Sequence, residues 1–287
     1  METLYRIVRN SFFPRILVGA LLAFFLYHSL ANHSNPTIPL QKPSVVQTAY
    51  AATWGDLAAT DHTERLLALA NTDHIALLNW ALENYQRHIR DYSCTFLKQE
   101  RINGNLKNPE KINVRFRDEP YSVLMQWTQN PGRIDKLLYV EGQNDGNMVV
   151  HPTGLFAFIP SVKKDPHSEE ARAASRNTCD NFGFQRTMQR FLEVYEDAKQ
   201  KGDLQIACLG KTQVDGRTCV ALERVLPPDA GYPYARVVIE IDAEYLVPTA
   251  TACYDWRGQL LSRYEYRDLQ FNAGLTPGSF IPAANGL

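Results

Sequence analysis

The chain has 287 residues, of which 45% are hydrophobic and 21% are charged, with 30 Lys and Arg residues against 31 Asp and Glu residues. A chain of this length can bury a substantial core, and its apolar content excludes an intrinsically disordered protein. The balanced charge lacks the basic excess of a nucleic-acid-binding protein, so we expect no nucleic-acid partner.

The first 31 residues have the order of an export segment. Arginines precede the apolar run 16–27, ILVGALLAFFLY, and the small residues Ser29 and Ala31 suit cleavage by a signal peptidase. The run is shorter than the roughly 20 residues of a membrane-spanning helix. An uncleaved anchor in the inner membrane is the alternative, because Phe12 and Phe13 lengthen the run. Both interpretations place the protein in the periplasm or cell envelope.

A tether and a helical stretch are predicted next. Residues 32–58 carry several prolines among polar residues, which indicates an extended tether. Apolar residues at spacings of three and four then predict helix over about 60–90, with Asp73 capping its second part. We expect a single domain over 59–287.

From Tyr92 the apolar period changes to two, which predicts antiparallel strands with one buried face. The segment 111–117, KINVRFR, shows the clearest alternation. The predicted strands are 92–101, 111–117, 121–127, 137–141, 148–151, 155–159, 204–209, 218–225, 235–241, 249–256 and 260–269.

The polar segment 162–180 interrupts the strands and is predicted to be a mobile loop. Apolar residues from Phe184 to Tyr195 then form the stripe of a second amphipathic helix. The predicted fold class is α+β, with a large curved antiparallel sheet that forms an unclosed half-barrel and two or three helices packed on its concave face.

The cysteines lie downstream of the export segment, where disulfides can form. An odd number leaves at least one thiol free. A two-residue turn at Asp215-Gly216 would place Thr212 opposite Cys219 and Glu223 opposite Cys208, which does not bridge the two cysteines. We interpret the cysteines as small buried hydrophobic residues. They are Cys94, Cys179, Cys208, Cys219 and Cys253.

The stretch 140–152, VEGQNDGNMVVHP, brings Glu141 and His151 close in sequence. Asp145-Gly146 predicts a hairpin with a two-residue turn, which would put the two side chains on opposite faces of the sheet. A three-residue loop would instead pair Tyr139 with His151 and make Glu141 a diagonal neighbour at about 7–8 Å. A hydrolase using this pair is therefore an alternative to a purely structural hairpin.

Other catalytic signatures are absent from the sequence. It contains no G-x-S-x-G, no H-E-x-x-H, no Gly-rich phosphate loop and no C-x-x-C. We therefore predict a protein that is not an enzyme, with no catalytic residue, no metal and no cofactor. In KQER, Lys98 and Glu100 share one strand face, and cross-strand ion pairs to Arg115 or Arg117 are expected.

The aromatic residues, 14 Tyr, 13 Phe and 4 Trp, need a surface to bury against. Either the helices fill the concave face completely, or the curved sheet and the helices leave an apolar cavity for a ligand. Alternation alone selects the candidate lining residues. They are Phe96, Val114, Phe116, Val123, Met125 and Trp127 on the sheet, with Leu78, Leu82 and Phe191 on the helices.

Several strings resemble a family of exported bacterial proteins of unknown function. They include YSCTFLKQERING (92–104), YVEGQNDGNMVVHP (139–152) and NAGLTPGSF (272–280), and the resemblance covers about residues 75–282. That family is more distantly similar in architecture to periplasmic lipoprotein carriers. The carriers have an unclosed antiparallel barrel whose helices cover an apolar cavity for acyl chains.

The resemblance implies an envelope protein that binds a lipid or acyl group in such a cavity, in lipid or lipoprotein handling. The chain departs from the carriers in its potential anchor and in the charged segment 162–180. The alternative function is a scaffold or protein-binding module with a fully packed core, which meets its partner through edge strands or loops.

Overall fold

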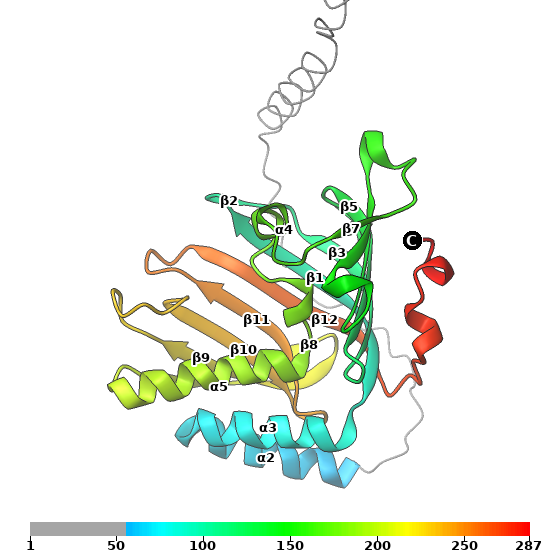
Figure 1. Ribbon diagram of the computed structural model, residues 1–287. Coiled ribbons are helices and arrows are strands. Elements are labelled where there is room, and N and C mark those ends of the chain that lie inside the picture. The colour runs from blue at the N-terminus through cyan, green and yellow to red at the C-terminus, as the bar shows by residue number, and fades with distance from the viewer. Residues whose placement is uncertain (1–55) are drawn as a thin grey trace, which may run out of the picture. The chain divides into compact units, whose positions relative to one another are not determined.

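A computed structural model describes residues 56–287. The predicted export segment and residues 32–55 of the predicted tether lie outside the described residues, so the division into segment, tether and domain stays a prediction. The described part is one large antiparallel sheet with helices packed across one of its faces (Figure 1).

Two consecutive helices open the described chain, α2 (Asp56–Thr72) and α3 (His74–His88). The carboxylate of Asp73 accepts hydrogen bonds from the backbone N–H groups of Ile75 and Ala76, both at 3.0 Å. This is the N-cap predicted from the sequence. The buried stripe of α3, from Leu77 to Tyr85, faces the core.

The sheet is antiparallel at every pairing and runs in the order β7-β6-β5-β4-β3-β1-β12-β11-β10-β9-β8, with β2 paired to β1. The first and last strands of the chain, β1 and β12, pair at its centre. The strand bounds are β1 Asp91–Ile102, β2 Asn105–Leu106, β3 Glu110–Arg117, β4 Ser122–Gln129, β5 Ile134–Val140, β6 Met148–Pro152, β7 Val162–Lys164, β8 Gln205–Val214, β9 Arg217–Val225, β10 Arg236–Asp242, β11 Pro248–Tyr254 and β12 Leu260–Phe271.

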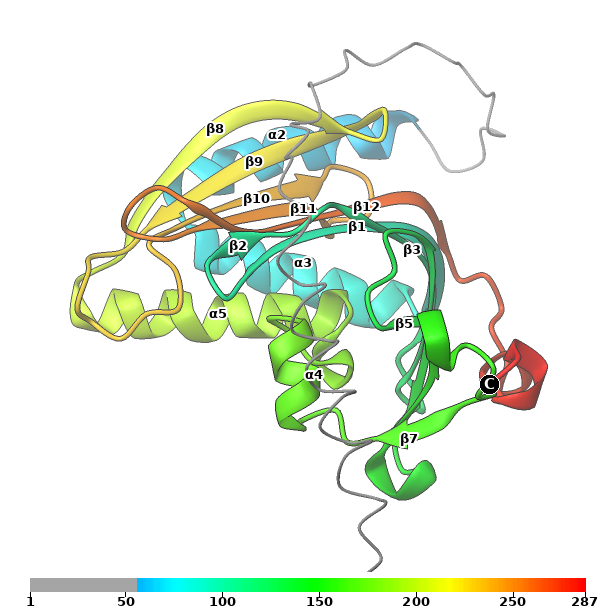
Figure 2. The ribbon, with the colours of Figure 1, turned by 90° about the horizontal axis from the view of Figure 1, so that it is seen from above.

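The chain crosses from one edge of the sheet to the other between β7 and β8. The crossing contains α4 (Glu169–Ala174) and α5 (Phe184–Lys201), and α5 buries the apolar stripe predicted for it. Figures 1 and 2 show α3 and α5 lying across the same face of the curved sheet. Because β7 and β8 each pair on one side only, the sheet stays unclosed, and the predicted half-barrel is confirmed.

Two sequence predictions in the 150s to 170s are wrong. The predicted strand 155–159 is a 3₁₀ turn, Gly154–Phe156, followed by an exposed loop. Its apolar run is continuous rather than alternating, so periodicity could not assign it to a strand. The segment 162–180, predicted to be a mobile loop, contains β7 and α4, which pack on β6 and over the cavity described below.

The β8–β9 hairpin follows its predicted turn only near the tip. Thr212 lies opposite Cys219, as expected, but Cys208 lies opposite Leu222 rather than Glu223. A bulge between Cys208 and Gly210 shifts the register by one residue. All five cysteines are free. Four of them are buried, which confirms their interpretation as small buried hydrophobic residues, whereas Cys208 is partly exposed and does not fit it.

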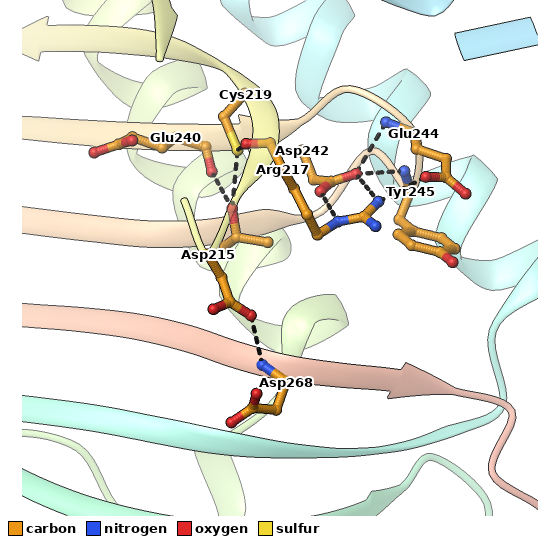
Figure 3. Close-up of polar contacts among 9 residues, drawn as sticks. Asp215, Arg217, Cys219, Glu240, Asp242, Glu244, Tyr245 and Asp268 are labelled. Carbon is orange, nitrogen blue, oxygen red and sulfur yellow. Dashed lines mark hydrogen bonds and ion pairs between the residues drawn. The ribbon is translucent and has the colours of Figure 1, made fainter. Parts of the chain in front are cut away.

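A polar cluster ties the ends of β9 and β10 together (Figure 3). Arg217 Nε and the fully buried carboxylate of Asp242 lie 2.5 Å apart, and the same guanidinium reaches Glu244 at 2.9 Å. The Asp242 carboxylate also accepts from the backbone N–H groups of Glu244 and Tyr245. These bonds fix the β10–β11 turn, because they join two of its backbone N–H groups to a buried carboxylate that is itself paired with Arg217.

The core lies between the concave face of the sheet and the helices. Its centre is aromatic, with Tyr92 and Phe184 ring centroids 4.9 Å apart and Phe184 and Tyr266 centroids 4.5 Å apart. Phe184 comes from the first turn of α5, whereas Tyr92 and Tyr266 come from the central strands. This contact positions the start of α5 over the middle of the sheet.

Candidate functional site: a cavity beneath α4 and α5

The concave face is only partly filled by the core. A cavity of about 520 Å³ lies between the sheet and the covering layer of α4, residues 175–183 and α5. That volume falls within the range of ligand sites in proteins. Its apolar and aromatic wall includes Phe96, Ile112, Met125, Trp127, Ile134, Leu137, Met148, Val150, Phe182, Phe191, Tyr234, Tyr264 and Tyr266.

The structure separates the predicted lining residues into two groups. Phe96, Met125, Trp127 and Phe191 line the cavity. The other five lie outside its lining, in or against the closed core beside α3 and the start of α5. These five are Leu78, Leu82, Val114, Phe116 and Val123.

Whether a predicted residue lines the cavity or packs in the core depends on its position along the strand. On β4, Val123 is fully buried in the core, whereas Met125 and Trp127, two and four residues further along the same face, reach the cavity. Alternation places all three side chains on one face. It does not determine where along the strand the covering helices stop touching the sheet.

One end of the cavity carries a paired charge network. The Lys98 ammonium lies 3.5 Å from Glu100 and 3.4 Å from Glu110, and Trp127 Nε1 donates to Glu110 at 2.5 Å. Lys98 and Glu100 share the face predicted for them, but the expected ion pairs with Arg115 or Arg117 do not form. Those arginines follow the opposite alternation on β3, and the cavity-facing carboxylate of that strand is Glu110.

Glu100 anchors the covering segment to the sheet. Its side chain is 2% exposed and accepts from Tyr264 Oη at 2.5 Å, Ser175 Oγ at 3.1 Å and the Arg176 backbone N–H at 3.2 Å. A buried carboxylate is stable only when it is hydrogen-bonded and paired. This carboxylate has both kinds of partner, so its role is to hold residues 175–176 over the cavity.

Arg224 occupies the other end of the cavity and differs from Glu100 in its partners. It is 1% exposed, and its Nε and Nη1 have no hydrogen-bond partner among the described residues. Its guanidinium carbon lies 5.1 Å from the Tyr195 ring centroid. Such a contact contributes about 2 kcal/mol when desolvated, less than the several kcal/mol that removing a charge from water costs. Burial accordingly lowers the pKa of Arg224.

The sequence contains a signal for Arg224 that alternation alone can find. Val220, Leu222 and Arg224 occupy every second position of β9, and the first two belong to the core. An arginine at the third core-facing position of a strand is a buried polar residue that calls for an explanation. The candidate lining residues were selected from apolar positions only, so Arg224 was not among them.

The hydrolase pair suggested by the sequence does not form. The β5–β6 hairpin exists, but residues 141–147 connect the strands and His151 lies opposite Lys136. His151 Nδ1 lies 2.6 Å from Asp135 Oδ1, while the Glu141 carboxylate lies 3.3 Å from Arg186. The connection is longer than either turn considered, and within it Asn144 and Asp145 adopt positive φ in a 3₁₀ turn.

The described part of the chain has neither a cluster of metal ligands nor a helix that could span a membrane. Among residues 62–287, no group of three or more His, Cys, Asp or Glu side chains is arranged to hold a metal ion. Over the same residues, every helix is too short or too polar to span a membrane.

Comparisons with solved structures return proteins of low similarity. Mycobacterium tuberculosis lipoprotein LppX is 11% identical, with 70% of this chain and 96% of that chain covered and a TM-score of 0.40. A putative outer membrane lipoprotein-sorting protein domain from Vibrio parahaemolyticus is 14% identical, with 73% and 98% covered and a TM-score of 0.36. The Pseudomonas aeruginosa MucA/MucB complex is 15% identical, with 73% and 61% covered and a TM-score of 0.43. With TM-scores below 0.5, these three carry no functional argument.

No curated protein matches the sequence. Residues 89–285, which include every strand of the sheet, match the family described as "Protein of unknown function (DUF1571)". The chain therefore belongs to the DUF1571 family, in agreement with the resemblance to a family of unknown function.

Proposed function

We propose that this protein binds the acyl part of a lipid in the cavity beneath α4 and α5, as a non-catalytic lipid-handling protein of the cell envelope. The observation that carries the proposal is the cavity of about 520 Å³ with its largely apolar and aromatic wall. An apolar wall of this size is costly when it is left in contact with water. A ligand that removes the wall from water explains why the cavity exists.

An acyl chain supplies enough driving force for binding. Each methylene group removed from water contributes about 0.8 kcal/mol. A chain of ten buried methylenes therefore offers roughly 8 kcal/mol before the entropy of association is subtracted. Met125 and Trp127 line one part of the cavity and Phe191 of α5 another, so a chain bound there would contact both sheet and helix.

The proposal is tested by native mass spectrometry of the protein purified without detergent, followed by extraction with organic solvent. We expect one bound lipid per chain. The variant Met125→Glu should lose that lipid, because it introduces a carboxylate into the apolar wall. The matched control is Gln126→Glu, which adds the same charge at the next position of β4, where the side chain points to the opposite face.

A folded Met125→Glu protein with undiminished lipid would contradict the proposal. So would a wild-type protein that is purified without lipid and binds none when mixed with phospholipid vesicles. Circular dichroism of both variants distinguishes lost binding from lost folding.

A second candidate function, as a protein-binding module, is favoured by a separate observation. The loop after β6 exposes Leu155 and Phe158 to 71% and 80% of their full areas. Contact sites for proteins commonly expose large apolar side chains in this way. The cavity does not fit the fully packed core that accompanied this alternative. Cross-linking from a photoreactive residue at position 158 in cells should trap one discrete partner if this function is correct, and yield only scattered products if it is not.

A further inference from the structure

Arg224 is the one feature of the cavity that an acyl chain leaves unexplained. Its side chain lines the cavity, is 1% exposed and has two nitrogens without hydrogen-bond partners in the described chain. A buried guanidinium is stable when it meets an anion, because its planar fork of donors matches two oxygen atoms. Within residues 62–287, whose side chains the structure describes, no ion pair supplies that anion.

The strands beside Arg224 present no carboxylate to it. Its register partners are Ile206 on β8 and Val237 on β10. The adjacent Glu223 follows the opposite alternation and pairs with Arg236 at 2.5 Å, on the other face of the sheet. The charge of Arg224 is therefore separated from the nearest carboxylate of its own strand by the sheet itself.

The carboxylates that line the cavity have other positions or partners. Glu100 and Glu110 pair with Lys98, and Glu170 pairs with Lys164. Glu193, on α5, is exposed and forms no ion pair with Arg224 in the described structure. The carboxylates of the cavity are thus paired with a lysine or turned toward solvent, whereas the guanidinium of Arg224 has no ion-pair partner within residues 62–287.

A second arginine strengthens this asymmetry. Arg190 projects from α5 into the lining, and its Nη1 donates to the Asn177 side-chain oxygen at 3.2 Å, a neutral acceptor. Arg176, in the covering segment, stacks on Tyr234 with its guanidinium carbon 5.6 Å from the ring centroid. The cavity lining therefore carries two arginines, Arg190 and Arg224, that form no ion pair within residues 62–287.

We propose that Arg224, together with Arg190, binds the anionic head group of an amphiphile whose acyl chain occupies the apolar part of the same cavity. This inference rests on the proposed function and specifies its ligand class as an acyl chain that ends in a carboxylate or phosphate. The head group lies beneath α5, and the chain extends over Tyr266 and Phe96 toward Met125. The low-polarity wall strengthens the contact between guanidinium and anion.

The test compares two ligands that share a chain and differ in the head group. Palmitate and hexadecan-1-ol displace the neutral fluorescent probe N-phenyl-1-naphthylamine from the full chain at pH 8, where the carboxylate is ionised. We expect palmitate to bind about tenfold or more tightly than the alcohol, because a guanidinium forms charge-assisted hydrogen bonds only with the acid. Hexadecyl phosphate, measured in the same way, distinguishes a phosphate from a carboxylate preference.

Substitutions of Arg224 test whether this residue causes the preference for palmitate. Arg224→Met should lower palmitate affinity about tenfold, to that of the alcohol, while its melting temperature stays the same or rises because an unpaired buried charge is removed. Arg224→Lys keeps the charge without the planar fork and should retain part of the preference. The matched control is Arg236→Met, which removes an arginine from the opposite face of the neighbouring strand and should leave the preference for palmitate intact.

The outcomes separate the inference from the function on which it rests. If neither ligand displaces the probe, the proposed lipid function itself fails. If both displace it with equal affinity, the cavity binds acyl chains but the role of Arg224 is wrong. If Arg236→Met abolishes the preference as fully as Arg224→Met, the effect comes from net charge and the inference is also wrong. The wild-type comparison needs no variant, so it decides the question even if Arg224→Met does not fold.

Discussion

Replacing Gly183 with alanine should destabilise the protein strongly, because this glycine meets two constraints at once. Gly183 caps α5 with φ 103° and ψ 158°, a region of backbone space that is essentially restricted to glycine. A Cβ built there lies 2.7 Å from Phe116 Cζ and 3.0 Å from Cε2. The phenyl ring has little room to move, since Tyr92 and Tyr121 lie 4.9 and 5.2 Å from it, centroid to centroid.

The expected magnitude is the sum of both effects. Backbone strain costs about 1–3 kcal/mol, and overpacking a rigid core costs about 1–3 kcal/mol more. We therefore expect Gly183→Ala to lose about 4 kcal/mol of unfolding free energy. For a domain of this size, about 2–4 °C of melting temperature is lost per kcal/mol, so the shift should be on the order of 10 °C. Urea denaturation and thermal circular dichroism measure the two quantities.

Gly210→Ala is the matched control. Gly210 has φ 90°, and a Cβ there meets nothing within 4 Å, so this variant introduces backbone strain without a clash. It should lose only about 1–2 kcal/mol. Equal losses for the two variants would refute the role of Phe116. In a double-mutant cycle, adding Phe116→Leu to Gly183→Ala should cost less than the sum of the single changes, because the smaller side chain makes room for the new methyl group.

Three further predictions concern stability away from the cavity. Asp242→Ala should lose about 3 kcal/mol in urea denaturation, because it removes the acceptor of Arg217 and of the backbone N–H groups of Glu244 and Tyr245, while Glu244→Ala, whose carboxylate is half exposed, should lose at most about 1 kcal/mol. Burial raises the pKa of Asp118 to about 6, above the ordinary value of about 4. The folded state therefore binds more protons between these values, and the stability attributable to this group falls as pH rises from about 4 to 6. Asp118→Asn should remove that fall when both proteins are denatured at several pH values. Phe158→Ser, in the exposed loop, should change the unfolding free energy by less than about 0.5 kcal/mol.

Each of these three stability predictions would be contradicted by a specific result. Similar losses for Asp242→Ala and Glu244→Ala would mean that burial of the ion pair contributes nothing. Parallel pH curves for the wild type and Asp118→Asn would show that this carboxyl titrates at its ordinary pKa in the folded protein. A large loss for Phe158→Ser would mean that the loop packs against the domain rather than standing in solvent.

The sequence by itself determined which side chains share a face of each strand and helix. Alternation of apolar residues predicted ten of the strands that form, spacings of three and four predicted α3 and α5, and Asp73 predicted the cap between the first two helices. These patterns succeed because side-chain direction repeats every two residues in a strand and every 3.6 in a helix. The hairpin at residues 141–147 was expected from its turn residues, since Asp and Gly tolerate positive φ.

Only the tertiary structure decided which side chains of a face are buried in the core and which residues lie opposite each other on paired strands. Val123 and Met125 share a face of β4, but one packs in the core and the other lines the cavity, because the covering helices touch only part of that face. A one-residue bulge in β8 and a longer connection before β6 changed the partners of Cys208 and His151. Arg224 became a candidate ligand residue only when its buried neighbours proved to contain no anion. Such properties depend on residues far apart in the chain, so no local pattern encodes them.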